Sequence, residues 1–379
     1  MKKLLPEVCT IQYGFPFDSA KFSDSNGMPL IRIRDVVRGY SETYTTEEYK
    51  SEYIVHENDL LIGMDGEFNI AKWGKTPALL NQRVCRLAPK DSIDKDYLFY
   101  FMPIALKRIE EKTPFVTVKH LSAKELNKIE IPILPLEEQR KIAETLSKVD
   151  ELIAFREQQL AKLDELVKAR FVEMFGNPIE NTMNWPKKLL RDITTKIGSG
   201  ATPKGGRESY PNAGVSLIRS MNVYDGQFLY KDLAHLTDEQ ATQLNGVTVE
   251  AEDVLVNITG ASVARSCVVP KDVLPARVNQ HVAIVRCNRE LLNPIFTNKM
   301  FINNEFKKAL LSIGESGGAT RQAITKKQLE ELSVVVPPLS IQNEFFTFSE
   351  CVDQQKQTVQ QSLDKLELMK KALMQEYFG

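Results

Sequence analysis

The chain has 379 residues, of which 42% are hydrophobic, so it is long enough for two or three domains with buried cores. Its formal net charge of −1 neither requires nor excludes a nucleic-acid partner, because a binding surface needs only local positive potential. No run of about 18 apolar residues occurs, which excludes a predicted membrane-spanning helix and a membrane partner.

The first block, residues 1–134, is predicted to contain mixed short strands, turns and helix. Pro29–Arg34 alternates apolar and basic residues, as in a half-exposed strand, and Asp59–Gly63 is a short apolar strand that stops at a glycine. Helical character follows around Tyr97–Lys112. Between Phe68 and Lys90 there are five basic residues and no acidic one, so this block has local positive charge.

Residues 135–176 are predicted to form one long helix. Leu146, Ile153, Leu160, Val167 and Met174 recur every seven residues, and a second apolar row beside them is interrupted by arginines. This is the sequence pattern of a coiled coil. Pro135 and Gly176 bound the segment, whose 40 or so residues correspond to roughly 60 Å of helix.

The second block, residues 177–336, begins with a linker to Pro186 and then repeats the order of features of the first. Val215–Arg219 and Asp253–Asn257 are predicted strands, and Asn293–Leu311 is predicted to be helical. Weaker matches extend the repeat: Lys2-Lys3-Leu4-Leu5 resembles Lys187-Lys188-Leu189-Leu190, and Asn81-Gln82-Arg83-Val84 resembles Asn279-Gln280-His281-Val282. Two related domains with loops of different length are therefore expected.

Residues 337–379 form a second long helix in register with the first. Pro135-Leu136-Glu137-Glu138-Gln139 corresponds to Pro338-Leu339-Ser340-Ile341-Gln342, and the copies then run without a gap to Phe175-Gly176 and Phe378-Gly379. Phe345, Val352, Val359, Leu366 and Leu373 form its complete apolar row. The pattern favours an antiparallel pair of helices between the two mixed domains. Ordinary oligomerisation helices are the alternative interpretation, although they do not explain why a basic, loop-rich block precedes each helix.

The sequence contains no recognisable catalytic constellation. The loop at Gly198–Gly206 has the glycines of a phosphate-binding loop but lacks its Lys-Ser or Lys-Thr, Asn293-Pro294-Ile295-Phe296 lacks the second proline of an amino-methyltransferase motif, and the four histidines have no metal-ligand spacing. The five cysteines lack C-x-x-C pairing, and Pro6 interrupts the start of the chain before any apolar stretch, so we expect reduced thiols, no signal peptide and a cytoplasmic location. Enzyme activity is not expected.

Polar and basic residues at strand ends and in loops are the candidate DNA contacts. Arginine suits bidentate contact with guanine, asparagine and glutamine suit adenine, and glycine-flanked cations suit phosphates. A solvated surface is the alternative for any one residue, but the matched positions favour binding. The candidates in the first block are Arg32, Arg34, Arg38, Lys72, Lys75, Gln82, Arg83 and Lys119. Those in the second are Lys204, Arg207, Arg219, Ser220, Asn222, Asn257, Thr259, Arg265, Asn279, Gln280, Arg321 and Gln322. Asp65 and Glu67 are weaker candidates for contact with cytosine.

The two Pro-Leu-x-x-Gln segments and the two Phe-Gly helix ends resemble the specificity subunit of type I restriction-modification systems, over essentially the whole chain. The resemblance implies an α+β fold in which two pseudo-repeated target-recognition domains, 1–134 and 177–336, are separated by an antiparallel coiled coil of two spacer helices, 135–176 and 337–379. It implies that each domain reads one half of a bipartite sequence in double-stranded DNA and that the helices fix the gap.

The same resemblance implies a subunit that is not itself catalytic. It would recruit two methyltransferase (modification) subunits and restriction/translocase subunits, which use S-adenosylmethionine, ATP and Mg, and would hold no cofactor or metal of its own. The competing hypothesis is a coiled-coil scaffold that binds proteins only. Ser340-Ile341 replaces Glu137-Glu138 in the second helix, so the contacts with partners at the two ends need not be equivalent.

Overall fold

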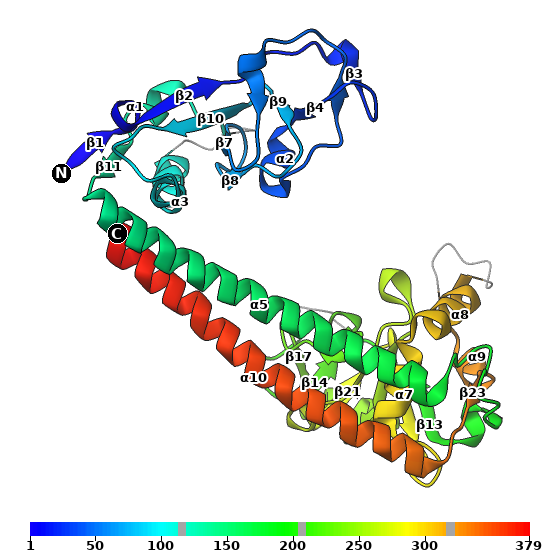
Figure 1. Cartoon of the computed structure of the whole chain (residues 1–379). Coiled ribbons are helices and arrows are strands. Elements are labelled where there is room, and N and C mark those ends of the chain that lie inside the picture. The colour runs from blue at the N-terminus through cyan, green and yellow to red at the C-terminus, as the bar shows by residue number, and fades with distance from the viewer. Residues whose placement is uncertain (113–118, 204–209, 316–322) are drawn as a thin grey trace. The chain divides into compact units, whose positions relative to one another are not determined.

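The computed structural model describes residues 1–112, 119–203, 210–315 and 323–379 (Figure 1). The chain folds into two compact units, one made of Met1–Glu157 with Gln361–Gly379 and the other of Gln158–Gln360. Each unit contains one mixed α/β head and about half of each long helix, α5 (Leu136–Phe175) and α10 (Leu339–Phe378). The unit boundaries therefore cross the helices, which the sequence-based division had kept as separate segments.

The described part of the first head contains two larger sheets, a two-stranded sheet and one long helix. The antiparallel sheet has the order β2 (Cys9–Tyr13), β10 (Val84–Pro89), β7 (Leu60–Gly63), β8 (Ile70–Lys72). The second sheet has the order β3 (Phe22–Ser23), β5 (Tyr44–Thr45), β4 (Met28–Ile31), β9 (Ala78–Leu80), β6 (Ile54–Val55), with β4 and β9 parallel. Helix α3 (Lys95–Lys112) shares one apolar core with β7 and β10 and with the long helices, and β1 (Lys2–Leu4) pairs with β11 (Glu130–Pro132) next to α5.

The second head repeats this topology. Its antiparallel sheet has the order β13 (Thr194–Ser199), β22 (Val282–Cys287), β19 (Val254–Asn257), β20 (Ser266–Val268). The other sheet has the order β17 (Ala234–Leu236), β14 (Val215–Ile218), β21 (Ala276–Val278), β18 (Thr248–Val249), with β14 and β21 parallel. β12 (Lys187–Leu189) pairs with β23 (Ser333–Val335) as β1 pairs with β11, so the predicted duplication extends through the heads.

Most of the strands and helices predicted from apolar patterns are present. Two predictions need correction. Pro29–Arg34 is not one strand, because β4 ends at Ile31 and α2 (Ile33–Arg38) begins where the Asp35 carboxylate accepts the backbone N–H of Arg32 at 2.8 Å. The helical stretch Asn293–Leu311 is two helices, α7 (Pro294–Phe301) and α8 (Asn304–Glu315), and Asn303 lies between them.

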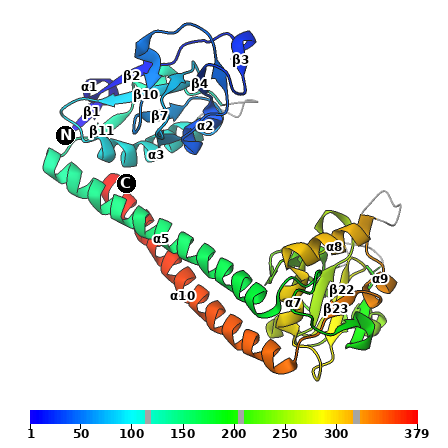
Figure 2. The same ribbon diagram turned by 45° about the vertical axis from the view of Figure 1, so that its right-hand side comes forward.

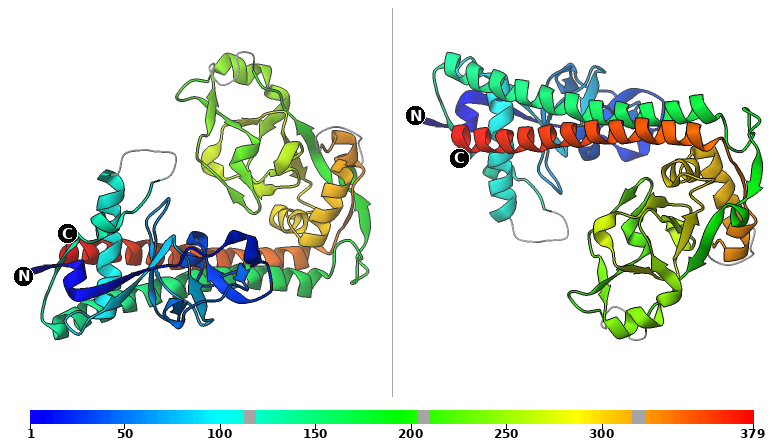
Figure 3. Two further views of the ribbon diagram at one scale, coloured as in Figure 1. Left: turned by 90° about the horizontal axis from the view of Figure 1, so that it is seen from above. Right: turned by 90° about the horizontal axis from the view of Figure 1, so that it is seen from below.

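The long helices pair antiparallel within each unit, and they lie side by side in Figure 1, Figure 2 and Figure 3. Polar contacts between the helices show the direction, because residue numbers rise on α5 as they fall on α10. In the first unit these contacts are Asp150–Lys370 (2.6 Å) and Arg156–Ser362 (3.2 Å), and in the second they are Asp164–Lys356 (2.5 Å) and Arg170–Glu344 (3.1 Å). The charged residues that interrupted the predicted apolar rows thus make the contacts between the helices.

The apolar rows of the helices are only partly buried against each other. Leu146, Val149, Leu163 and Val167 of α5 are buried, whereas Ile153 and Leu160 are half-buried. Each buried stretch also belongs to the core of a head: Leu146 packs in the core of the first head, and Val167 packs in that of the second. The rows therefore serve helix–head packing as well as helix–helix packing.

A buried glutamine joins each long helix to its head. The Gln139 side chain accepts the backbone N–H of Asp94 at 2.8 Å and donates to the carbonyls of Leu134 (2.8 Å) and Ser92 (3.3 Å). Gln342 makes the equivalent three hydrogen bonds. Its side chain accepts the backbone N–H of Asn293 at 2.9 Å and donates to the carbonyls of Pro337 (2.7 Å) and Leu291 (3.0 Å). Both glutamines are 0% exposed. This is the structural reason for the glutamine in each Pro-Leu-x-x-Gln segment.

About three turns further along each helix, equivalent aspartates face each head. Asp150 of α5 accepts the hydroxyl of Tyr100 at 2.9 Å, and burial together with this carboxylate raises the pKa of Tyr100. In the second unit Lys299 takes the place of Tyr100. Burial lowers the pKa of Lys299, and the negative charge of Asp353 offsets part of that effect. The aspartates of the two matched Val-Asp pairs thus interact with the head in both units, through a hydrogen bond in the first and through charge in the second.

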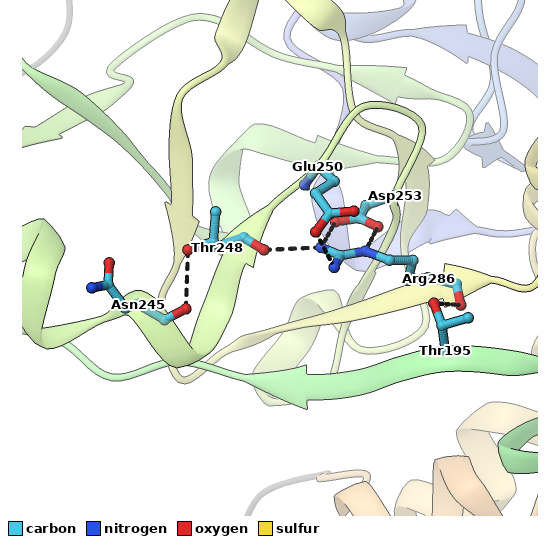
Figure 4. A network of polar contacts seen from close by, with 6 residues as sticks. All are labelled: Thr195, Asn245, Thr248, Glu250, Asp253 and Arg286. Atoms are coloured by element: carbon cyan, nitrogen blue, oxygen red, sulfur yellow. Dashed lines mark hydrogen bonds and ion pairs between the residues drawn. The ribbon is translucent and has the colours of Figure 1, made fainter.

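A charged network holds the sheet of the second head (Figure 4). The Arg286 guanidinium donates from Nε and Nη2 to the Asp253 carboxylate at 2.8 and 2.9 Å and also contacts Glu250 and the Thr248 carbonyl. Hydrogen bonding to Asp253 is the largest cause that raises the pKa of Arg286. Asp253 is 1% exposed, so its charge depends on this partner.

The first head has a related pair in which the arginine comes from a different position. Arg86 lies 3.0 Å from Asp59, the counterpart of Asp253. However, Arg86 stands opposite Leu61 in the strand pairing, and in the second head Ile284 stands opposite the corresponding Leu255. Arg286 is two residues further along the strand and on the same face, because side chains alternate. Both heads therefore contain the aspartate–arginine ion pair, although the arginine occupies a different strand position in each.

We expect Gln139→Ala to lower the free energy of unfolding of the first unit by about 3 kcal/mol, because it leaves the buried N–H of Asp94 and two carbonyls unpaired. Hydrogen–deuterium exchange of α3 measures the change. Gln361→Ala, an exposed glutamine on α10 in the same unit, is the matched control and should change little. Equal exchange rates in the two variants would contradict the role given to Gln139.

We expect Arg286→Met to destabilise the second unit by about 3 kcal/mol, because it leaves the buried carboxylate of Asp253 without its cation. Urea unfolding followed by hydrogen exchange of β19 and β22 provides the measurement. Arg191→Met removes an arginine that pairs with Asp192 on the surface at 3.7 Å and should cost less than about 1 kcal/mol. A loss no larger for Arg286→Met than for this control would show that the network does not stabilise the head.

Candidate nucleic-acid interface

Two candidate arginines occupy equivalent positions in the heads. Arg32 follows β4 and Arg219 follows β14, and each begins a short helical turn. The backbone N–H of Arg32 donates to Asp35, and that of Arg219 donates to Asn222 at 3.1 Å. Each guanidinium also lies over an aromatic ring, Phe22 at 5.7 Å and Tyr210 at 5.8 Å from the ring centroid. Capping and stacking therefore hold both arginines at a strand end.

Two further candidate arginines of the first head, Arg34 and Arg38, lie on α2 instead of the predicted strand edge. Arg34 contacts Thr43 at 3.4 Å and Asp35 at 3.7 Å, and Arg38 pairs with Glu42 at 3.8 Å. Both side chains are largely exposed, so these pairs are weak. Arg34 and Arg38 therefore extend the basic surface that begins at Arg32, but along a helix.

Three predicted asparagine contacts are corrected by the structure. Asn222, Asn257 and Asn279 are at most 5% exposed. Asn222 donates to the carbonyls of Leu229 and Lys231, Asn257 donates to those of Ser220 and Val223, and the Asn279 carbonyl oxygen accepts the N–H of His281. These side chains satisfy backbone groups and hold the loops in place, so they do not present an edge to a ligand.

Two matched connections carry the remaining polar residues of this kind. Gln82 and Arg83 lie between β9 and β10, and Gln280 lies between β21 and β22. Each connection passes close to a glycine: a Cβ on Gly14 would lie 2.0 Å from the Asn81 carbonyl oxygen, and one on Gly200 would lie 1.8 Å from that of Val278. Only glycine fits at these two positions, so the neighbouring strand can support the connection. Gln280 also contacts the Thr202 hydroxyl.

The other described candidates differ in whether their side chains already have partners within the protein. Lys72 lies 2.9 Å from Asp96 and over the ring of Phe99, and Lys119 contacts Glu110 at 3.0 and 3.4 Å, so both cations are engaged with α3. Lys75 is exposed in the turn after β8. In the second head Ser220 follows Arg219, Thr259 contacts His281, and Arg265 stacks on Tyr224 at 4.2 Å. Lys204, Arg207, Arg321 and Gln322 lie outside the described residues.

The sequence did not indicate the aromatic partners Phe22, Tyr210 and Tyr224, which lie far from their arginines along the chain or in a different turn. Nor did the sequence indicate His120, which lies between α3 and α4 (Ala123–Leu126) and contacts Asp65. Aligning the halves gives one signal for His120, because Leu121 and Ile324 make equivalent backbone hydrogen bonds and so place His120 opposite Ala323.

Both heads contain buried cysteines. Burial raises the pKa of Cys9, Cys85 and Cys267 to about 12, so these thiols stay protonated at neutral pH. Among the described residues, no group of three or more His, Cys, Asp and Glu side chains is placed to hold a metal ion. Within the same ranges, no helix combines the length and apolar character needed to span a bilayer.

Two similar heads, each with a held arginine at a strand end, and a pair of long antiparallel helices define a class of protein with two recognition heads on one helical scaffold. Comparison with known proteins identifies the family. The model of the type I restriction modification DNA specificity domain matches residues 1–165 and 183–368. The chain belongs to this family, the specificity subunits of type I restriction-modification enzymes, whose members recognise DNA sequences and assemble with other subunits. The resemblance found in the sequence is confirmed.

Known relatives and solved structures agree with this assignment. The chain is 30% identical to the EcoBI specificity subunit of Escherichia coli over 93% of its own length and 80% of the relative's. It is 22% identical to the MjaVIII specificity subunit of Methanocaldococcus jannaschii, over 91% and 87%. The type I S subunit of M. genitalium has the same fold, with a TM-score of 0.61, 15% identity, and coverage of 100% of this chain and 96% of the other. A chain from a structure on complex assembly of a type I restriction-modification system has a TM-score of 0.59, at 17% identity and with coverage of 100% and 97%.

Proposed function

We propose that each head reads one half of a bipartite sequence in double-stranded DNA. The observation that carries this proposal is the equivalence of Arg32 and Arg219, which follow corresponding parallel strands and are capped and stacked in the same way. Stacking on an aromatic ring leaves the edge of the Arg32 guanidinium available, and that edge matches the O6 and N7 acceptors of guanine. In Arg219 the Nη2 group also donates to the Asp232 carbonyl and Nε is buried, so Nη1 is the nitrogen left for a base. Neighbouring exposed cations such as Lys75 and Arg38 suit phosphates, which position a protein without reading bases.

The two heads would read different half-sites because their side chains differ on a shared backbone. Arg83 in the first head corresponds to His281 in the second, and Asp65 corresponds to Thr259. The turn after Arg32 is a helix with two more arginines, whereas the turn after Arg219 contains Ser220 and Met221. Base readout depends on the donors and acceptors presented, so such differences are sufficient for two specificities.

The long helices would set the length of the spacer between the half-sites. Each is a single helix of 40 residues, corresponding to roughly 60 Å, and each enters both units without a break. The buried glutamine at the start of each helix fixes the direction in which the helix leaves its head. A stiff connection of this kind favours one spacer length over its neighbours.

We also propose that the chain directs enzymes to the site and carries none of the chemistry. Large exposed apolar side chains on the helices suit helical partners: Leu152, Phe155, Leu368 and Met369 in the first unit, and Leu166 and Val172 in the second. The partners would be two methyltransferase subunits, joined by restriction/translocase subunits. S-adenosylmethionine, ATP and Mg would be used by those partners and not by this chain.

A scaffold that binds only proteins remains the alternative, and DNA binding separates the two. Filter binding of genomic DNA by the chain, with and without a methyltransferase partner, should show retention that falls steeply with salt concentration, because phosphate contacts release counterions. A chain that captures the methyltransferase but never retains DNA would support the scaffold.

We expect Arg219→Ala to lower the base preference within one half-site by roughly tenfold or more, or to abolish it. Recognition of the other half-site should not change. Arg32→Ala should have the complementary effect on the other half-site. Mapping of the methylated motif in cells that express each variant gives the readout. An intact motif in both variants would remove these two arginines from the recognition surface.

We expect an insertion of four helical residues into both long helices, at the 157/158 and 360/361 boundaries, to lengthen the recognised spacer. One extra turn adds roughly 6 Å, which is close to two base pairs at roughly 3.4 Å each. The half-sites themselves should not change. Four residues appended after Gly379 serve as the control. An unchanged spacer in the helix variant would refute the proposed measuring role of the helices.

A further inference from the structure

Three chain segments meet in the same way at one edge of each head. In the first head the N–H of Met64 donates to the Arg83 carbonyl and the Met64 carbonyl accepts the N–H of Leu121, at 3.0 and 2.7 Å. In the second head Ile258 makes the same two bonds, with His281 and Ile324, at 3.0 and 2.8 Å. Bridges between Asp65 and His120 and between Thr259 and Ala323 complete the match. Positions 65, 83 and 120 are therefore equivalent to 259, 281 and 323.

The first head fills these positions with Asp65, Arg83 and His120. One Asp65 oxygen lies 3.2 Å from Nη1 of Arg83, and the other lies 2.5 Å from Nδ1 of His120. The Asp65 side chain is 15% exposed, whereas that of Arg83 is 56% exposed. One nitrogen of the guanidinium is thus tied to a half-buried carboxylate. No other partner of Arg83 is found among the described residues, so the rest of its fork faces outward.

The second head fills the same positions with Thr259, His281 and Ala323. The Thr259 hydroxyl contacts Nδ1 of His281 at 2.5 Å, and Ala323 has no polar side chain to add. Only Nε2 of the imidazole remains for a ligand. The hydroxyl can donate or accept, so it can hold the ring in either tautomer. In both heads, therefore, a nitrogen-bearing side chain (Arg83 or His281) contacts a shorter oxygen-bearing side chain (Asp65 or Thr259).

We propose that Arg83 and His281 each read one base pair of their half-site, and that Asp65 and Thr259 are positioning residues that aim them. This inference rests on the proposed function of the heads and names their specificity determinants. Arg83 presents parallel N–H groups and would select guanine through O6 and N7. His281 offers one hydrogen bond and would select less strongly at the equivalent base pair. Asp65, suggested by sequence as a reader of cytosine, instead points its oxygens at Arg83 and His120.

The charge of Asp65 suits positioning better than direct readout. A carboxylate facing DNA is repelled by the phosphates unless cations neutralise it, and Asp65 has a cation beside it in Arg83. Fixing one end of a long guanidinium side chain also reduces the rotamer freedom that it would lose on binding. Asp65 thus contributes through the side chain that it holds.

Selection from a randomised duplex library by the chain, with its methyltransferase subunits added, tests this inference. The wild-type protein should enrich a motif with a guanine at one position of the first half-site. Arg83→Gln should lower the preference for that guanine by roughly tenfold or more. Asp65→Asn should lower it less, at the same base pair, and Asp65→Asn combined with Arg83→Gln should be no worse than Arg83→Gln alone. Thr259→Val should change only the second half-site.

Controls separate positioning from a general structural effect. Arg140→Gln removes an exposed arginine beside Asp94 in the same unit and should leave every base preference unchanged. Hydrogen exchange of β7 should match the wild type in the Asp65 and Arg83 variants. An unchanged base preference in Arg83→Gln, or a uniform loss of affinity for all sequences in Asp65→Asn, would overturn the inference while leaving the proposed function intact. A wild-type protein that enriches no sequence would instead refute the proposed function.

Discussion

A single buried amide at the start of each long helix joins that helix to its head. Gln139 and Gln342 each join three segments: the loop that begins a head helix, the strand end that leads into the long helix, and the long helix itself. An apolar residue could fill the space but could not pair the backbone groups that these segments bring together. These bonds therefore set the angle at which each long helix leaves its head.

Around this junction, apolar packing and charged contacts have different roles. The apolar rows of the helices are shared between helix–helix and helix–head contacts, and charged residues on the same faces make the contacts that fix the pairing direction. This packing does not require rigid loops in the heads. Loops of one shared scaffold can differ freely, as Arg83 and His281 do, while the backbone hydrogen bonds beneath them stay the same.

The sequence predicts the regular parts of this structure well because periodic apolar burial dominates them. Both 40-residue helices follow from apolar residues repeated every seven positions, strands such as β7 and β19 follow from short apolar runs, and the duplication follows from matching segments of the two halves. The polar residues were harder to assign. Asn257 is buried because its amide caps distant carbonyls, and Arg34 lies on a helix because Asp35 caps it locally, and neither contact has a periodic signal. The arginine that pairs with Asp59 or Asp253 even changes position between the heads, so alignment of the halves would not find it.

The chain returns at its end to the unit in which it began. Phe378, the penultimate residue, is buried with its ring 5.2 Å from that of Tyr97 and 5.8 Å from that of Phe101, in the core of the first head. A ribosome therefore finishes the second unit before it can supply the last piece of the first. A nascent chain therefore lacks part of this core until residues 361–379 have been made, and loss of these residues would affect the unit that was made first.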